Sequence, residues 1–143
     1  MNSIVWPEKY TPGTTDNFVS NEVIGKGLTA AEVWTYLNDT SYWKSYYKNV
    51  SKIGFDGGAG PTLSPNLDFR FTTFVFPVLA HGSEYVPPTP RQPGNRVRVL
   101  TQESQIGQPG KEMAVAKPNP MLNAHQDWLD GLVRTAREKR NSK

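Results

Sequence analysis

The stretch from residue 119 to residue 136, NPMLNAHQDWLDGLVRTA, decides the fold class. Asn119 can cap a helix, and Pro120 fits its first position because a first-turn N–H has no intrahelical partner. One face then collects residues at helical spacing: Met121, Leu122, His125, Trp128, Leu129, Leu132, Val133 and Ala136. The spacing predicts a long amphipathic C-terminal helix. Gly131 lowers its intrinsic stability by about 1 kcal/mol relative to Ala, so tertiary packing must hold the helix.

Upstream of this helix, apolar and polar residues alternate in strand-like segments. The clearest segment, residues 67–76, places Phe69, Phe71 and Thr73 on one side and Arg70 on the other. The predicted strands span residues 18–26, 49–55, 67–76, 78–86 and 96–106. Tight turns separate most of them, which predicts an antiparallel sheet. Neither face of residues 18–26 is cleanly apolar, so the inner side of this strand is expected to meet a partly wet surface.

Two short helices are expected between the first two strands. Thr29 and Glu32 have the spacing of a capping box, and Ser41 can cap a second turn. Six aromatic rings lie between residues 34 and 47: Trp34, Tyr36, Tyr42, Trp43, Tyr46 and Tyr47. The predicted fold is therefore α+β, with a curved antiparallel sheet, two short helices after the first strand and a long C-terminal helix. We expect one domain over residues 1–143, with an irregular lead-in (1–16) and a basic tail (138–143).

Composition excludes several classes of protein. A chain of 143 residues and 16.0 kDa has the size of one domain, and it contains no cysteine. Disulfide scaffolds, thiolate nucleophiles and cysteine zinc sites are therefore excluded. No apolar run approaches the roughly 18 residues of a membrane span, and the first residues lack the order of a signal peptide. We expect a soluble, cytoplasmic protein without integral membrane association.

The positive charge belongs to one end of the chain. Residues 134–143 hold five basic side chains and one acidic one, a local charge of +4 against +3 for the whole chain. The remainder therefore carries a charge of −1. A basic end on a helix is typical of a solvated terminus that complements the helix dipole. We expect no nucleic-acid partner.

Several segments, taken together, resemble a known superfamily. They are residues 29–34 (TAAEVW), the aromatic group of Trp43, Tyr46 and Tyr47, residues 69–74 (FRFTTF) and residues 118–129 (PNPMLNAHQDWL). These segments and their order are similar to bacterial members of the START-like SRPBCC superfamily, the helix-grip proteins that include the birch-pollen-allergen type and the polyketide cyclase/dehydrase group. The resemblance covers most of residues 15–138. It implies a sheet wrapped around the C-terminal helix and a mostly apolar cavity between them for a hydrophobic small molecule or lipid.

The chain departs from that pattern in one place. The family's sheet usually has six or seven strands, whereas about five are counted here, and a hairpin is missing near residues 92–95. Either this member is shortened or the chain omits a segment. A shortened sheet would have exposed edges and a more open pocket.

Nucleotide and metal sites find little support in the sequence. Residues 25–30, GKGLTA, fit Gly-x-Gly-x-x-Ala, but no acidic residue follows about 20 positions on and no parallel βαβ unit surrounds them. The glycines are interpreted as a turn. His81 and His125 have no carboxylate partner at a patterned spacing, so we expect no metal and no cofactor.

The candidate site consists of side chains that could face the cavity implied by the resemblance: Trp34, Tyr46, Tyr47, Phe71, Thr73, His125, Trp128 and Leu129. His125 is interpreted either as a core histidine or as an acid or base. Arg70 and Glu103 lie mid-strand; they could pair if both face inward, or lie on the solvated face. His125, Arg70 and Glu103 are the candidate catalytic residues.

Three functions remain open at this point. The first is binding of a hydrophobic or amphipathic small molecule, lipid- or polyketide-like, in an internal cavity. The second is a cyclase or dehydratase acting on a polyketide-like substrate, with His125 and either Arg70 or Glu103 moving protons. The third is an interaction module, which predicts that the aromatic residues between 34 and 47 form a contiguous exposed patch. The oligomeric state is not predicted.

Overall fold

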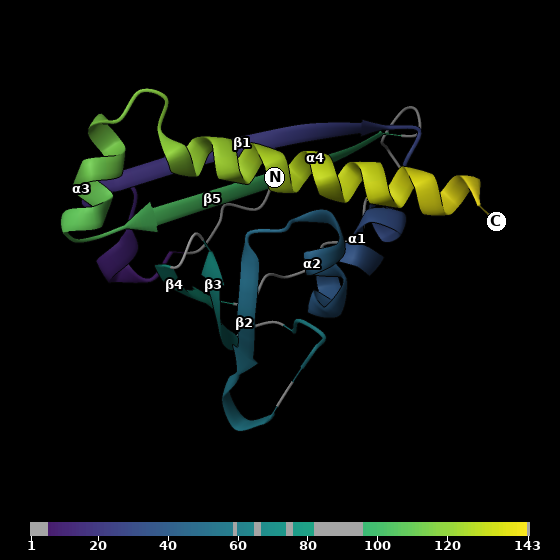
Figure 1. The fold of residues 1–143 in the computed structure, drawn as a ribbon, viewed down its shortest axis with the longest axis horizontal. Helices are drawn as coiled ribbons and strands as arrows, with labels where there is room; N and C mark the ends of the chain where they lie inside the picture. The colour runs from purple at the N-terminus through teal and green to yellow at the C-terminus, as the bar shows by residue number, and fades with distance from the viewer. Residues whose placement is uncertain (1–5, 59, 65–66, 74–75, 82–95, 143) are drawn as a thin grey trace.

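The computed structural model describes residues 6–58, 60–64, 67–73, 76–81 and 96–142, and for 76–81 it describes the backbone (Figure 1). Its elements follow in the order η1 (Glu8–Tyr10), β1 (Asn17–Lys26), α1 (Ala30–Asn38), η2 (Thr40–Tyr42), α2 (Trp43–Tyr46), β2 (Val50–Phe55), η3 (Asp56–Gly58), β3 (Asp68–Thr73), β4 (Phe76–His81), β5 (Arg96–Gln105), α3 (Gln108–Val115) and α4 (Pro120–Asn141). The predicted α+β class, antiparallel strands and long C-terminal helix are confirmed.

In the described part of the chain, the strands form two small antiparallel sheets, where the sequence predicted one. β1 pairs with β5 in an unbroken register from Asn17↔Gln105 to Lys26↔Arg96, and β2, β3 and β4 form the second sheet. The register between β2 and β3 shifts between Ser51 and Gly54. The prediction failed because alternation reports which face of a strand is buried and carries no information on its partner.

Helix α4 lies along the β1–β5 ribbon (Figure 1). Asn119 caps it as predicted, since its side-chain oxygen accepts a hydrogen bond from the backbone N–H of Met121 at 3.0 Å. Most of the predicted stripe is buried: Met121, His125, Leu129, Leu132, Val133 and Ala136. Leu122 is 40% exposed, so it lies outside that stripe.

The two short helices form with one correction. Thr29 and Glu32 make the predicted capping box, with the Thr29 backbone N–H donating to Glu32 Oε2 at 2.7 Å. The second turn is capped by Asp39, whose Oδ1 accepts from the Ser41 backbone N–H at 2.9 Å, and not by Ser41. A carboxylate two residues before a backbone donor closes this Asx-type turn without help from the serine.

An aromatic core lies where the second sheet, α2 and α4 meet. Trp43 is 2% exposed, and its ring packs edge-on against Phe69, Phe71 and Trp128 at centroid distances of 5.7, 5.8 and 4.9 Å. Its indole nitrogen donates to the Leu37 carbonyl at 2.9 Å, so the buried polar group is satisfied. Trp43 therefore connects α2 to α1 through its hydrogen bond, and to β3 and α4 through its ring contacts.

Gly131 explains how closely α2 approaches α4. A Cβ atom built on Gly131 would lie 2.5 Å from the Tyr46 carbonyl oxygen. Only glycine permits this approach, which supplies the tertiary packing that the sequence required at this position.

Three segments differ from the predictions or fall outside the description. Helix α3 was not predicted. Of the strand expected over residues 78–86, β4 covers the part up to His81. The hairpin expected to be missing near residues 92–95 lies wholly outside the described residues.

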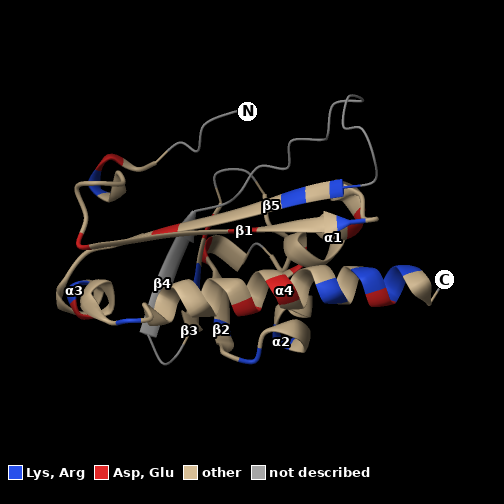
Figure 2. Cartoon of the chain, turned by 90° about the horizontal axis from the view of Figure 1, so that it is seen from above, with Lys and Arg blue, Asp and Glu red and all other residues tan. Residues whose placement is uncertain are grey.

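The basic tail is helical, since α4 runs to Asn141, and Figure 2 shows its cations near those at the end of the β1–β5 ribbon. Among the described residues, no helix has both the length and the apolarity to cross a membrane.

Candidate functional site

Five polar side chains form a hydrogen-bonded series, which we call the polar chain: Asn119, Asn17, Gln105, Glu103 and His125. The Asn119 amide donates to Asn17 Oδ1 at 2.9 Å, and the Asn17 amide donates to Gln105 Oε1 at 2.6 Å. The Gln105 amide then donates to Glu103 Oε1. The polar chain therefore links the first turn of α4 to β1 and β5.

The local fold explains why these side chains meet. Asn17 opens β1 and Gln105 closes β5, and the antiparallel register places the two residues directly opposite each other. Side chains at positions two apart on β5 share a face, so Glu103 lies on the same side as Gln105. Asn119 precedes α4 as its N-cap, and His125 follows about one and a half turns later on the buried stripe.

His125 and Glu103 form the end of the polar chain that enters the interior. Their side chains are 7% and 20% exposed, and His125 Nε2 lies 3.0 Å from Glu103 Oε2. His125 Nδ1 is buried and has no hydrogen-bond partner within the described part of the chain. An unsatisfied buried polar atom costs about 1–3 kcal/mol, so this nitrogen marks a place where a polar partner would be stabilising.

Tyr47 brings a hydroxyl group to the same region from the end of α2. Its oxygen lies 3.2 Å from Thr73 Oγ1 of β3, and its ring centroid is 6.4 Å from that of Trp128. Burial raises the pKa of Tyr47, hydrogen bonds with Thr73 and Asn49 oppose the rise, and the charges of Asp127 and Glu103 add to it. Tyr47 thus joins Thr73 of β3 to Trp128 of α4, and the charge of Glu103 in the polar chain acts on its hydroxyl group.

Tyr46 is oriented differently from its neighbour. Its hydroxyl donates to the Tyr36 carbonyl at 3.1 Å, and burial raises its pKa far above the ordinary value, while the indole N–H of Trp128 acts in the opposite direction. The Trp128 nitrogen is buried and reaches no acceptor at full hydrogen-bond geometry among the described residues. Tyr46 therefore serves packing between α1, α2 and α4.

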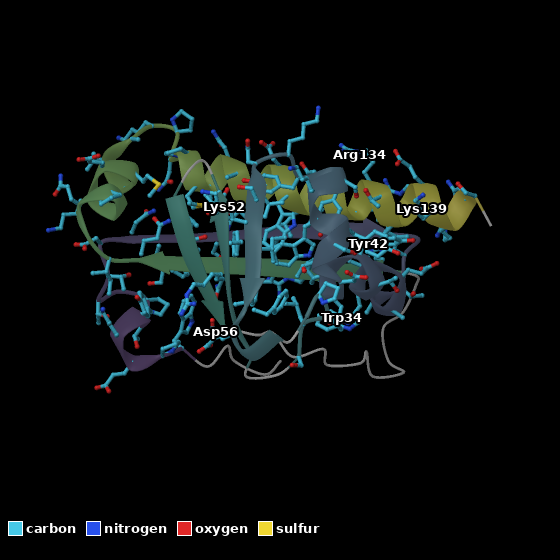
Figure 3. All side chains as sticks on the ribbon, turned by 60° about the horizontal axis from the view of Figure 1, so that its bottom comes forward. Trp34, Tyr42, Lys52, Asp56, Arg134 and Lys139 are labelled. Atoms are coloured by element: carbon cyan, nitrogen blue, oxygen red, sulfur yellow. The ribbon has the colours of Figure 1, made fainter. Side chains whose placement is uncertain are left out.

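The remaining predicted cavity residues divide between the core and the periphery. Phe71 is half-buried against Trp43, and Leu129 is 2% exposed within α4. Trp34 lies half-buried on α1 at the side of the molecule (Figure 3). The structure thus joins Tyr47 to Thr73 and Trp128, and it packs Phe71 and Trp128 on the same Trp43 ring, while His125 pairs with Glu103.

Arg70 does not join the site. Its side chain is 64% exposed and pairs with Asp56 at 2.8 Å, and Asp56 lies at the end of β2 away from α4 (Figure 3). The inward Arg70–Glu103 pair is not formed, and the solvated alternative for Arg70 is correct. The reason is strand parity, because Arg70 faces opposite to the inward Phe69. Glu103 instead pairs with His125.

Three further observations describe the surroundings of the candidate site. Trp43, Tyr46 and Tyr47 are buried, so the aromatic residues between 34 and 47 do not form the contiguous exposed patch that an interaction module predicted. A groove of about 270 Å³ lies between α3 and the start of α4, away from the predicted cavity residues; it is lined by Pro109, Glu112, Met113, Ala116 and Pro120. No three metal-ligating side chains gather in the described ranges.

Sequence reasoning missed Asn17, Gln105 and Asn119 as partners of the site, although Asn119 was predicted as a cap. One signal was present, since the inner face of the first strand carries asparagine where an apolar residue is expected, and such a residue requires a buried partner. Asn21 repeats this signal four residues further along the same face of β1, where its amide donates to the Leu122 carbonyl at 3.0 Å.

Comparison with protein-family models and with curated protein sequences found no match. Among solved structures, the chain is similar to the crystal structure of hypothetical protein jhp0584 from Helicobacter pylori. The two share 40% sequence identity with a TM-score of 0.81, and the match covers 95% of this chain and 97% of the other.

Proposed function

This chain belongs to the same family as hypothetical protein jhp0584 from Helicobacter pylori, and from the side chains that its own fold brings together we propose that it binds a hydrophobic or amphipathic small molecule. The binding region lies between α4 and the second sheet, against Phe71, Thr73, Tyr47 and Trp128, with His125 as the polar contact. A lipid- or polyketide-like molecule has the required mixture of apolar surface and a few polar groups.

The observation that carries the proposal is the buried, unpartnered Nδ1 of His125. A ligand site typically offers an apolar lining and a small number of polar groups that set orientation. In the proposed site the aromatic rings supply the lining, and His125 and the hydroxyl groups of Tyr47 and Thr73 supply the polar contacts. A helix-grip arrangement, with the strands curving around α4, would open the space between them when a ligand enters.

A second candidate is an acid–base enzyme on the same scaffold, and the observation that favours it is the His125–Glu103 contact of 3.0 Å. A carboxylate on one ring nitrogen orients a histidine and stabilises its protonated form, while the other nitrogen is left to exchange a proton with a substrate. A cyclase or dehydratase step on a polyketide-like molecule would use this arrangement. Such an enzyme would alter its ligand, whereas a binding protein would release it unchanged.

The test is native mass spectrometry of protein purified from its expression host, with denatured protein as the mass control. We expect an additional small mass that is lost on denaturation. Thr73→Leu fills the inward face of β3 and should abolish retention, while Thr72→Leu, one residue along on the opposite face, should not. Both variants are first compared with the wild type by thermal unfolding, so that loss of fold is recognised.

Two results would overturn the binding proposal: protein that carries no small molecule and takes up no added 1-naphthol, or retention that survives in folded Thr73→Leu. The enzyme alternative is decided by incubating the retained molecule with fresh protein. A change in its mass with the wild type, absent with His125→Gln, identifies it as a substrate.

A further inference from the structure

The direction of every hydrogen bond in the polar chain follows from the helix cap at its far end. Asn119 Oδ1 accepts from the Met121 backbone N–H at 3.0 Å, and a backbone N–H can only donate. The remaining polar group of the Asn119 side chain is its NH₂ group, which donates to Asn17 Oδ1. The same reasoning makes the Asn17 amide nitrogen the donor to Gln105, and the Gln105 amide nitrogen the donor to Glu103.

The Gln105 amide donates to Glu103, so the Glu103 carboxylate accepts a hydrogen bond at this end of the polar chain. Its Oε1 receives the Gln105 amide, and its Oε2 faces His125 Nε2 at 3.0 Å. Since an ionised carboxylate only accepts hydrogen bonds, Nε2 must carry the ring hydrogen. In the neutral imidazole the hydrogen is then absent from Nδ1, and this buried nitrogen presents a lone pair.

We infer that the polar chain fixes a ring hydrogen of His125 on Nε2, so that the neutral ring presents a lone pair on Nδ1, and that the ligand offers an un-ionised hydroxyl group as the donor to His125 Nδ1. This inference rests on the proposed function and names the class of ligand: an alcohol, phenol or enol is selected over an otherwise similar molecule that carries only a carbonyl or carboxylate. Asn119, Asn17 and Gln105 are positioning residues, which act on the ligand through Glu103 and His125.

The isosteric substitution Glu103→Gln should reverse the direction of the hydrogen bond between residue 103 and His125 Nε2. In Glu103→Gln, the new side-chain oxygen must still accept from Gln105, because the direction of the chain up to that point is unchanged. The new NH₂ group then faces His125 Nε2 as a donor, so the ring has to accept there and carry its hydrogen on Nδ1. Glu22→Gln is the matched control: it removes the same charge from a neighbouring strand, where Glu22 pairs with Arg98 on the exposed face.

The ring state is measured by long-range ¹H–¹⁵N correlation NMR on protein labelled at histidine. The chain holds two histidines, so the His125→Gln spectrum assigns both signals. We expect the Nε2–H form in the wild type and in Glu22→Gln, and the Nδ1–H form in Glu103→Gln. A variant that only perturbed packing would broaden the signals without exchanging the roles of the two nitrogens. A wild-type ring in the Nδ1–H form, or one unchanged in Glu103→Gln, would overturn the inference.

Ligand class is measured by titrating 1-naphthol, a hydroxyl donor, and 1-naphthaldehyde, an acceptor of similar size. We expect the wild type to bind 1-naphthol more tightly by roughly two- to tenfold, and Glu103→Gln to reverse that order. Equal affinities in the wild type would refute the ligand class while leaving the proposed function intact. If neither molecule binds and the purified protein carries no small molecule, the proposed function fails and the ligand class fails with it, whereas the ring state is still decided by NMR.

Discussion

Replacing Gly131 by alanine tests whether the contact between α2 and α4 governs the arrangement of the site. In an isolated helix this substitution would stabilise by about 1 kcal/mol, because glycine is a poor helix former. Here the new methyl group would lie 2.5 Å from the Tyr46 carbonyl oxygen and 3.4 Å from Tyr46 Cβ. A backbone atom cannot rotate away as a side chain does, so the two helices must separate.

The expected change in the free energy of unfolding follows from these two opposing effects. Overpacking a buried position costs about 1–3 kcal/mol, here about 2–3 kcal/mol because the obstacle at 2.5 Å is a backbone atom, and the gain in helix propensity returns about 1 kcal/mol. We expect Gly131→Ala to lower the free energy of unfolding by about 1–2 kcal/mol and the midpoint temperature by roughly 4–8 °C. Separation of α2 from α4 should also weaken the packing of Tyr47 on Trp128, which near-ultraviolet circular dichroism reports.

Urea unfolding followed by tryptophan fluorescence measures the change in free energy, with an unchanged slope as the condition for comparison. Gly110→Ala in α3 is the matched control, because its nearest neighbour, Gln105 Cβ, lies at an ordinary contact distance of 3.4 Å. That variant should match or exceed the wild type in stability. A Gly131→Ala protein as stable as the wild type, with unaltered near-ultraviolet dichroism, would refute the assigned role of this contact.

Three further predictions concern the polar chain, the buried tyrosine and the excluded arginine. Asn119→Ala removes the α4 cap and the donor to buried Asn17, and should lower the free energy of unfolding by roughly 2–3 kcal/mol in urea; Asn119→Asp, which restores the cap alone, should recover part of that loss, and full recovery would contradict the polar chain. Burial raises the pKa of Tyr46, so the unfolded state ionises first: stability is full below pH about 10 and falls as the pH rises beyond it, and Tyr46→Phe should flatten this alkaline decline in stability measured against pH. Arg70→Ala should change stability by less than about 1 kcal/mol and leave retention of the ligand unaltered in native mass spectra, since its partner Asp56 is also exposed; lost retention would return Arg70 to the site.

Local chemistry made α4, β3 and the first capping box predictable. The stripe from Met121 to Ala136 repeats with the helical period, and Asn119 and Pro120 mark its start. Phe69 and Thr73 alternate with exposed Arg70, so the buried face of β3 follows from the letters alone. Each of these features depends on residues within a few positions of one another.

The features that sequence reasoning missed depend on distant residues or on weak local signals. Helix α3 buries only Gly110, so it has no apolar stripe to reveal it. The partnership of His125 with Glu103 joins a helix to a strand 22 positions earlier, and periodicity shows the buried face of each without showing that they meet. Arg70 and Glu103 were equivalent in the sequence as mid-strand charges; strand parity relative to the core distinguished them.

The pairing of β1 with β5 has a consequence for how the chain acquires its structure. Asn17 meets Gln105 across 88 positions, so within the described residues the sheet partner of β1 is synthesised only after β2, β3 and β4. Closing so long a loop before any contact rewards it slows folding. The backbone hydrogen-bonding edge of β1 that β5 covers therefore stays without that partner while β2, β3 and β4 are synthesised, and the β1–β5 ribbon and α4 complete the core late.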